Sequence, residues 1–357
     1  MTSLNTQIKA FYLSSAVPDL QWQTDADEVQ IRLYYQHTGN TLFESALTAT
    51  AGFVSFYETR EIIERYMRLN GIARLYPLQV EHRENDSWHL DASMTIIFCE
   101  KNIKLDEHDY STSGWLQDHF LSTLTAKVLP TDDDTVEQLF FVQPQETPRN
   151  PSLHVAYIDD DDNIASSDIT LQASFNPSQT NLFVCEFSIA DIKSAITDAV
   201  NIIAVTVSVG SRHMEYYRPA RRENVAFRFL NTFNVMESAY LAAVVSRKTE
   251  DNRKIAHLTG KLALYDRKPV TEYEVETGPL SFEEASWIDQ LITSPDVRLL
   301  DGTPLIITDG EAVCNNNNAE MNSAKFAYRE LDQRHSISGQ EPAPNIFTVP
   351  PHSYQFD

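Results

Sequence analysis

The sequence predicts a mainly β protein of tandem β-sandwich or partly open barrel-like domains, with a few short helices and an extended C-terminal arm. Short β-branched or alternating segments recur along the chain, helical periodicity is confined to a few short stretches, and the last residues are rich in proline. Strand signals at such close spacing are typical of sandwiches and barrels. A hydrophobic content of 42% over 357 residues is enough for several packed cores.

The strand pattern is clearest at residues 28–35, where Val29, Ile31, Leu33 and Tyr35 fall on one face. The same criteria predict strands at Phe53–Tyr57, Leu75–His82, Ser93–Glu100, Gln138–Gln143, Leu153–Ile158, Ile169–Phe175, Leu182–Phe187, Ile203–Val209, Val225–Leu230, Tyr240–Ser246, His257–Tyr265, Leu305–Thr308 and Ala324–Glu330.

Helical periodicity and capping residues predict three helices and a weaker fourth. The Asn70-Gly71 pair supplies a stop for the first, and Ser281 with Glu284 forms a capping box at the start of the third. The predicted helices are Thr59–Leu69, Ile189–Asp198 and Phe282–Thr293, with the weaker one at Gly114–Leu121.

Segments with the composition of turns and loops, together with a faint internal repeat, suggest the domain organisation. Phe53 and Phe183 are 130 residues apart, as are Ile62 and Ile192, and each pair belongs to a strand–helix–strand segment. The spacing fits a duplication, although coincidence stays open. We predict β domains at residues 1–127, 128–219 and 220–335, the second a candidate repeat of the first, and a proline-rich arm at 336–357.

Charge and motif content exclude several classes of protein. The chain has 28 Lys and Arg against 51 Asp and Glu, a formal charge of -23. Phosphate backbones and anionic lipids repel such a chain, so we expect neither nucleic-acid binding nor membrane insertion. The sequence lacks GxGxxG, GxxxxGK[ST], GxSxG and HExxH, and we find no signal peptide or long apolar run. We therefore predict no catalytic residue, no cofactor and no metal site.

Side chains that resemble metal or catalytic sites have simpler interpretations. Asp159–Asp162 lacks the glycine and bidentate Glu of a calcium loop, so a hairpin turn is the better interpretation. His108 and His119 adjoin carboxylates, but neighbours on a strand point to opposite faces. Three widely separated cysteines exclude zinc ribbons and disulfide scaffolds, and we expect Cys99 and Cys185 to be buried.

Two segments have the composition of a protein interface. The first is a basic cluster with aromatic side chains, and the second is the C-terminal arm, whose prolines lower the entropy lost on docking. A solvated strand end is an equally good interpretation of the first. The candidate interface residues are Arg212, Tyr216, Tyr217, Arg218, Arg221 and Arg222 in the cluster, and Phe347, Tyr354 and Phe356 in the arm.

Residues 42–67 and 281–329 together resemble tail-associated structural proteins encoded by phages and prophages of Bacteroides-type bacteria. In the first, LFESALTATAGFVSFYETREIIERYM, paired strands lead into a short helix; in the second, a helix precedes a TSPDV turn, a DG hairpin, an IIT strand and AKFAYRE. The resemblance implies a distal-tail or baseplate-like building block that acts in rings or rows of copies. It carries no catalytic signature, and the arm has no counterpart in it.

We therefore expect a non-enzymatic structural protein of the virion, assembled in the host bacterial cytoplasm, whose partners are its own copies and other tail proteins. The alternative is a receptor- or glycan-binding virion protein, because β-sandwiches bind sugars on exposed aromatic rings. Trp88 and Trp115 lie in polar, loop-like sequence and are its candidate glycan contacts. A hydrolase is the least favoured class, since the 51 acidic residues single out no catalytic pair.

Overall fold

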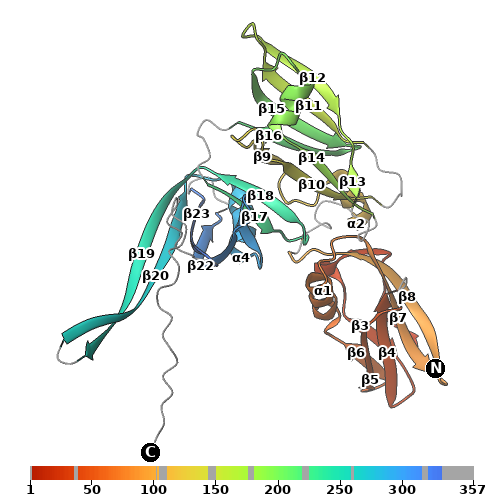
Figure 1. The fold of residues 1–357 in the computed structure, drawn as a ribbon. Helices are drawn as coiled ribbons and strands as arrows, with labels where there is room; N and C mark the ends of the chain where they lie inside the picture. Colours follow the sequence, from red (N-terminus) through yellow and green to blue (C-terminus); the bar gives the residue numbers. More distant parts are fainter. Residues whose placement is uncertain are drawn as a thin grey trace, which may run out of the picture.

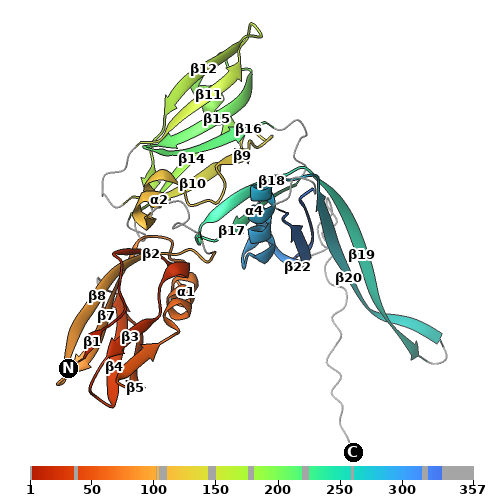
Figure 2. The ribbon, with the colours of Figure 1, turned by 180° about the vertical axis from the view of Figure 1, so that it is seen from behind.

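The computed structural model describes residues 2–35, 39–101, 103, 111–143, 150–175, 181–218, 225–258, 261–315 and 321–331, with side chains except at 175 and 251–269. Among the described residues, strands account for 53% and helices for 14%, and no sheet closes into a barrel. The predicted mainly β fold is therefore confirmed. Three β units meet near one point, and a long hairpin extends away from the third (Figures 1 and 2).

The first unit packs a five-stranded sheet, in the order β2-β8-β7-β4-β5, against a three-stranded sheet β1-β3-β6. Alternation in β4 turns Val29, Ile31 and Leu33 into the core, where Trp22 and Met67 are also buried. The elements are β1 (Ser3–Leu4), β2 (Phe11–Leu13), η1 (Ser14–Ala16), β3 (Leu20–Gln23), β4 (Glu28–Tyr35), β5 (Thr41–Thr48), β6 (Phe53–Phe56), α1 (Thr59–Leu69), β7 (Tyr76–Glu84) and β8 (Ser87–Ile97).

The middle unit has a five-stranded sheet in the order β9-β16-β15-β11-β12 and a three-stranded sheet β10-β14-β13, and α3 precedes β15. Its elements are α2 (Thr112–Asp118), β9 (Ala126–Val128), β10 (Glu137–Val142), β11 (Ser152–Ile158), β12 (Ile164–Thr170), β13 (Ser174–Phe175), β14 (Leu182–Phe187), α3 (Ile189–Ala195), β15 (Asn201–Val209) and β16 (Arg212–Tyr217).

The five-stranded sheets of these two units have the same topology. β2 pairs in parallel with β8, as β9 does with β16, and the remaining neighbours are antiparallel in both. In both units a strand of the smaller sheet leads directly into a helix, β6 into α1 and β14 into α3. The correspondence runs through the whole sheet and agrees with the 130-residue spacing of Ile62 and Ile192.

The third unit is one seven-stranded sheet, in the order β18-β17-β21-β22-β23-β20-β19. Helix α4 packs on β22 and β23, so that Trp287, Ile288 and Leu291 meet Phe227 and Phe326 in a separate core. The elements are β17 (Val225–Leu230), β18 (Met236–Leu241), β19 (Ala243–Leu258), β20 (Lys261–Thr277), α4 (Phe282–Thr293), β21 (Val297–Leu299), β22 (Pro304–Val313) and β23 (Ser323–Glu330).

The loop between β17 and β18 joins all three units. Phe233 is fully buried, and its ring stacks on Trp115 at 5.4 Å between centroids. Asn234 donates to the carbonyls of Met67, in the last turn of α1, and Ile72, which follows the helix. Asn231 donates to the carbonyl oxygen of Leu121 at 2.8 Å. A single short loop therefore fixes the first, middle and third units to one another.

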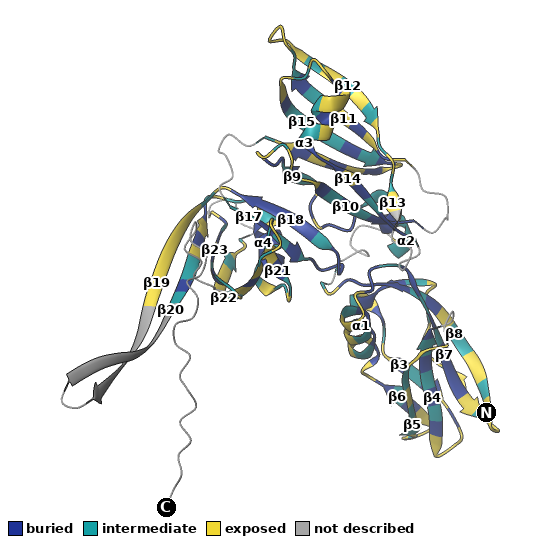
Figure 3. Cartoon of the chain, viewed as in Figure 1, coloured by how far each residue is buried: buried dark blue, intermediate teal, exposed yellow. Residues whose placement is uncertain are grey.

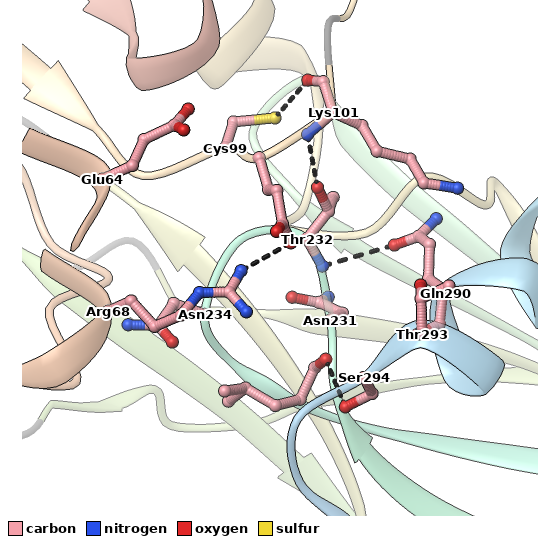
Figure 4. A network of polar contacts seen from close by, with 12 residues as sticks. Glu64, Arg68, Cys99, Lys101, Asn231, Thr232, Asn234, Gln290, Thr293 and Ser294 are labelled. Carbon is pink, nitrogen blue, oxygen red and sulfur yellow. Dashed lines mark hydrogen bonds and ion pairs between the residues drawn. The ribbon is translucent and has the colours of Figure 1, made fainter. Parts of the chain in front are cut away.

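A chain of polar contacts reinforces this junction (Figure 4). Lys101 donates its backbone N–H to the hydroxyl of Thr232 at 2.9 Å, and Thr232 donates its own N–H to Gln290 at 3.3 Å. The thiol of Cys99 donates to the Lys101 carbonyl at 3.1 Å, and burial raises the pKa of that thiol to about 12. These contacts link β8 to α4 and leave Cys99 a structural, protonated side chain.

The predicted helices Thr59–Leu69 and Phe282–Thr293 have the observed bounds, and the Ser281–Glu284 capping box is present. The weaker prediction, Gly114–Leu121, was shifted: the helix is Thr112–Asp118, because the hydroxyl of Ser111 accepts the N–H of Gly114 and caps an earlier start. Strand prediction was least accurate at Tyr240–Ser246 and His257–Tyr265, where the chain forms two strands of 16 and 17 residues.

Candidate functional site

The described part of the predicted basic interface cluster does not form one continuous surface patch. Alternation along β16 turns Arg212, Met214 and Tyr216 inward, and Arg212 and Tyr216 are only 5% and 0% exposed. The guanidinium of Arg212 donates to the carbonyls of His119 at 3.1 Å, Val142 at 2.8 Å and Leu116. The prediction was therefore wrong for Arg212 and Tyr216, which are internal structural residues.

The remaining residues of the cluster do not share one environment. Tyr217 lies on the outward face of β16, and its hydroxyl donates to Glu284 of α4 at 3.3 Å. Arg218 is half-buried and donates to the carbonyl of Ile202 at 2.6 Å. Arg221 and Arg222 lie outside the described residues, as do Phe347, Tyr354 and Phe356 of the arm.

A buried polar cluster connects the middle unit to the third. Glu137 of β10 accepts hydrogen bonds from the hydroxyls of Tyr216, at 3.3 Å, and Tyr240 of β18. Beside it, Lys127 Nζ lies 2.7 Å from Glu237 Oε1, and these side chains are 3% and 4% exposed. Burial raises the pKa of Glu137, an effect that the charge of Lys127 opposes, and burial also raises the pKa values of both tyrosines.

A cavity of about 430 Å³ opens next to this cluster, between β9, β18 and α4. Leu124, Leu241 and Ile288 contribute apolar walls, and Lys127 and Trp287 also line it. The Trp287 ring lies 5.7 Å from Lys127 Nζ, and its indole nitrogen has no hydrogen-bond partner among the described residues. The cavity is suited to an apolar group that carries a hydrogen-bond acceptor.

The chemistry of this region is that of a structural joint. Lys127 is ion-paired with Glu237, which also accepts hydrogen bonds from Ser122 at 2.6 Å and Asn231 at 2.8 Å. Glu137 is held by two tyrosine donors. Because each carboxylate is engaged in fixed contacts, the cluster stabilises the junction between units.

The two candidate glycan contacts differ in burial. Trp115 is only 6% exposed, because it lies on the buried side of α2 and its ring stacks on His119 and Phe233. Its predicted exposure was wrong. Trp88 is half-buried, and the guanidinium of Arg32 lies 4.2 Å from its ring centroid. Only Trp88 therefore keeps a partly accessible ring.

The acidic and cysteine motifs have the predicted structural roles. Asp159 Oδ1 accepts the N–H groups of Asp161 and Asn163, which makes residues 159–162 the turn between β11 and β12. Cys99 and Cys185 are buried, and Cys314 is exposed. Among the described residues, no three His, Cys, Asp or Glu side chains converge as metal ligands.

The most unusual surface is the β19–β20 hairpin, for which sequence analysis predicted only the short strands Tyr240–Ser246 and His257–Tyr265. Only Tyr273–Glu276 of β20 pair with β23, so beyond Tyr273 the hairpin is a two-stranded ribbon. At 3.4 Å per residue, the ribbon from Lys248 to Leu258 extends about 35 Å. Residues 244–250 of β19 are all exposed, on both faces of the strand (Figure 3).

Comparison with known proteins identifies no relative. No protein-family model matches this sequence, and a search of curated proteins finds none that is similar. Within the described part of the chain, no helix is both long and apolar enough to cross a membrane.

Proposed function

We propose that this chain is a non-enzymatic structural protein of a phage tail or baseplate, which self-assembles and links tail components within the virion. The observation that carries the proposal is the β19–β20 hairpin, which extends away from the body with an open edge (Figure 1). The resemblance of residues 42–67 and 281–329 to tail-associated proteins supplies the setting.

The hairpin supports a role in assembly because the rest of its own chain contributes little to its stability. A two-stranded ribbon is at best marginally stable in water, and it needs a third strand or an apolar surface. The described part of β19 presents Val244 and Val245 at 68% and 37% exposure, followed by a polar and charged run from Ser246 to Glu250. Pairing with another protein would satisfy its edge and bury its faces.

The rigid junction supports a structural role as well. Phe233, Asn231 and Asn234 fix the three units around one loop. A component that sets the spacing of its neighbours benefits from such rigidity, whereas an enzyme commonly needs a movable element over its site.

Shortening the hairpin tests this proposal. Glu250 and Val270 are cross-strand partners, so residues 251–269 can be replaced by an Asn-Gly turn without changing the strands that remain. We expect the parent protein to associate as its concentration rises, by light scattering, and the shortened protein to associate more weakly. A parent that stays monomeric at every concentration and is absent from tails of purified particles would contradict the proposal.

Glycan recognition is the alternative, and it now depends on Trp88. The ring is partly accessible beside Arg32, an arrangement that can stack on a sugar. Saturable binding on a glycan array that Trp88→Ala abolishes would favour this alternative. Trp115→Phe is the matched control, because that side chain is internal and should leave glycan binding unchanged.

A further inference from the structure

The two edges of the seven-stranded sheet differ sharply. Edge strand β18 is covered by the middle unit, where Glu237 and Tyr240 are buried against β9 and β10. Edge strand β19 has no partner on its outer side among the described residues. Its backbone N–H and C=O groups on that side are therefore available to a further strand.

Two other open edges lack the same properties. β5 and β12 are also edge strands, but one face of each of their sheets packs into a core. Each of these two strands contains a single charged residue, Glu44 in β5 and Asp168 in β12. Pairing either strand with its own copy would create no attraction between opposite charges. In β19, residues 247–251 read Arg-Lys-Thr-Glu-Asp, which passes from basic to acidic in five positions.

We propose that β19 pairs antiparallel with β19 of a second copy of this chain, about a two-fold axis at Thr249. This register puts position 248 opposite position 250 of the partner and position 247 opposite position 251, so each basic residue meets an acidic one. The two seven-stranded sheets become one continuous sheet. The inference rests on the proposed structural function and names the partner and the register.

The side chains of Lys248 and Glu250 are already exposed and close together before any pairing. Lys248 Nζ lies 2.8 Å from Glu250 Oε1 on one face of β19, and both side chains are solvent-accessible. In the paired state the same two charges face those of the second copy. Cross-strand pairs of opposite charge stabilise antiparallel strands, and like charges directly opposite each other destabilise them.

A disulfide trap tests the register directly. In a Cys314→Ser background, Thr249→Cys puts two thiols on the two-fold axis. Cα atoms directly opposite each other are about 4.5–5.5 Å apart, within disulfide range. Val244→Cys is the matched control, because in this register its two copies are ten positions, or about 34 Å, apart. We expect a disulfide-linked dimer of the Thr249→Cys protein on mild oxidation and none of the Val244→Cys protein.

Charge reversal provides a second test that does not depend on cysteine chemistry. Lys248→Glu turns the two pairs between positions 248 and 250 into repulsive ones, leaves the 247–251 pairs unchanged, and should weaken dimerisation roughly tenfold, measured by sedimentation equilibrium. The double variant Lys248→Glu/Glu250→Lys is self-complementary again and should restore it. A parent that associates while Thr249→Cys gives no linked dimer, or while the double variant stays as weak as the single one, overturns this interface but leaves the proposed function intact. A strictly monomeric parent overturns both.

Discussion

Replacing Lys127 by Met should be among the most destabilising single changes in this protein. The Lys127 ammonium lies 2.7 Å from the Glu237 carboxylate, and both side chains are almost wholly buried. Removing one member of such a pair leaves an uncompensated charge in the interior, which costs about 3–5 kcal/mol. Methionine has a similar apolar stem, so the loss of packing adds little.

The double variant Lys127→Met/Glu237→Gln separates the charge effect from the packing effect. Gln can still accept from Ser122 or Asn231, which donate to Glu237 at 2.6 and 2.8 Å in the parent. Because the Glu237 charge is removed together with its ion-pair partner, we expect the double variant to recover much of the lost stability. The remainder reflects Glu137, whose ionised form the Lys127 charge also favours.

The measurement is denaturant unfolding combined with amide hydrogen exchange in β9 and β18, which reports on the contact between the middle and third units. A loss below about 1 kcal/mol for Lys127→Met would be the value of a solvent-exposed pair and would refute the reasoning. A double variant no more stable than the single one would also refute it.

Three further predictions concern the junction, the buried acid and the arm. Asn234→Ala should lower the free energy of unfolding by about 1–2 kcal/mol, because the side chain donates to Met67 and Ile72 and the backbone φ is 63°; Asn234→Gly tolerates that φ and should lose less, by urea unfolding. The pKa of Glu137 is raised above its ordinary value of 4.5, so the unfolded chain ionises first and the folded state loses stability as the pH rises from 4.5 to the folded pKa. Glu137→Gln should therefore gain stability relative to the parent as the pH rises from about 4 to 8, and a constant difference in unfolding midpoint would contradict this. Removal of residues 336–357 should reduce the mass of the assembled species in light scattering, and unchanged association would exclude the arm as a link between copies.

The regular elements were predictable where one local signal dominated. α1 and α4 have their predicted bounds because an Asn-Gly stop and a capping box leave little choice of end. β4 was equally clear, since four alternating apolar residues define one face. The shared topology of the first two units was foreshadowed only by spacing, because a sheet retains its strand order after its sequence has diverged.

Arg212 and Tyr216 were wrongly predicted as interface residues because composition was considered without the direction of side chains along the strand. Residues 212–217 alternate between core and surface, so the basic and aromatic residues divide between two faces. The signal that could have corrected this was present: Arg212, Met214 and Tyr216 are two positions apart. Trp115 shows the converse error, since its polar neighbours lie on the solvent side of a helix that buries the ring.

The length of the two strands of the β19–β20 hairpin escaped prediction for a different physical reason. Sequence patterns detect strands by the contrast between a buried face and a solvent face, and the described part of β19 from Val244 to Glu250 has no buried face. A strand without a core carries no such pattern within its own chain. If β19 pairs with a second copy as proposed, its partner residues belong to another molecule, and the basic-to-acidic order of residues 247–251 is the pattern that remains visible.

Rigidity at the junction and the open edge at the hairpin act together. The β17–β18 loop contacts α1 through Asn234, α2 through Phe233 and Leu121 through Asn231, so the third unit cannot reorient without breaking buried contacts. Pairing at β19 would therefore fix the directions of the first and middle units in both copies, at distances set by the ribbon. A flexible junction would allow the same pairing but would leave those units unordered. The combination favours a component that transmits geometry between neighbours over one that only adheres to them.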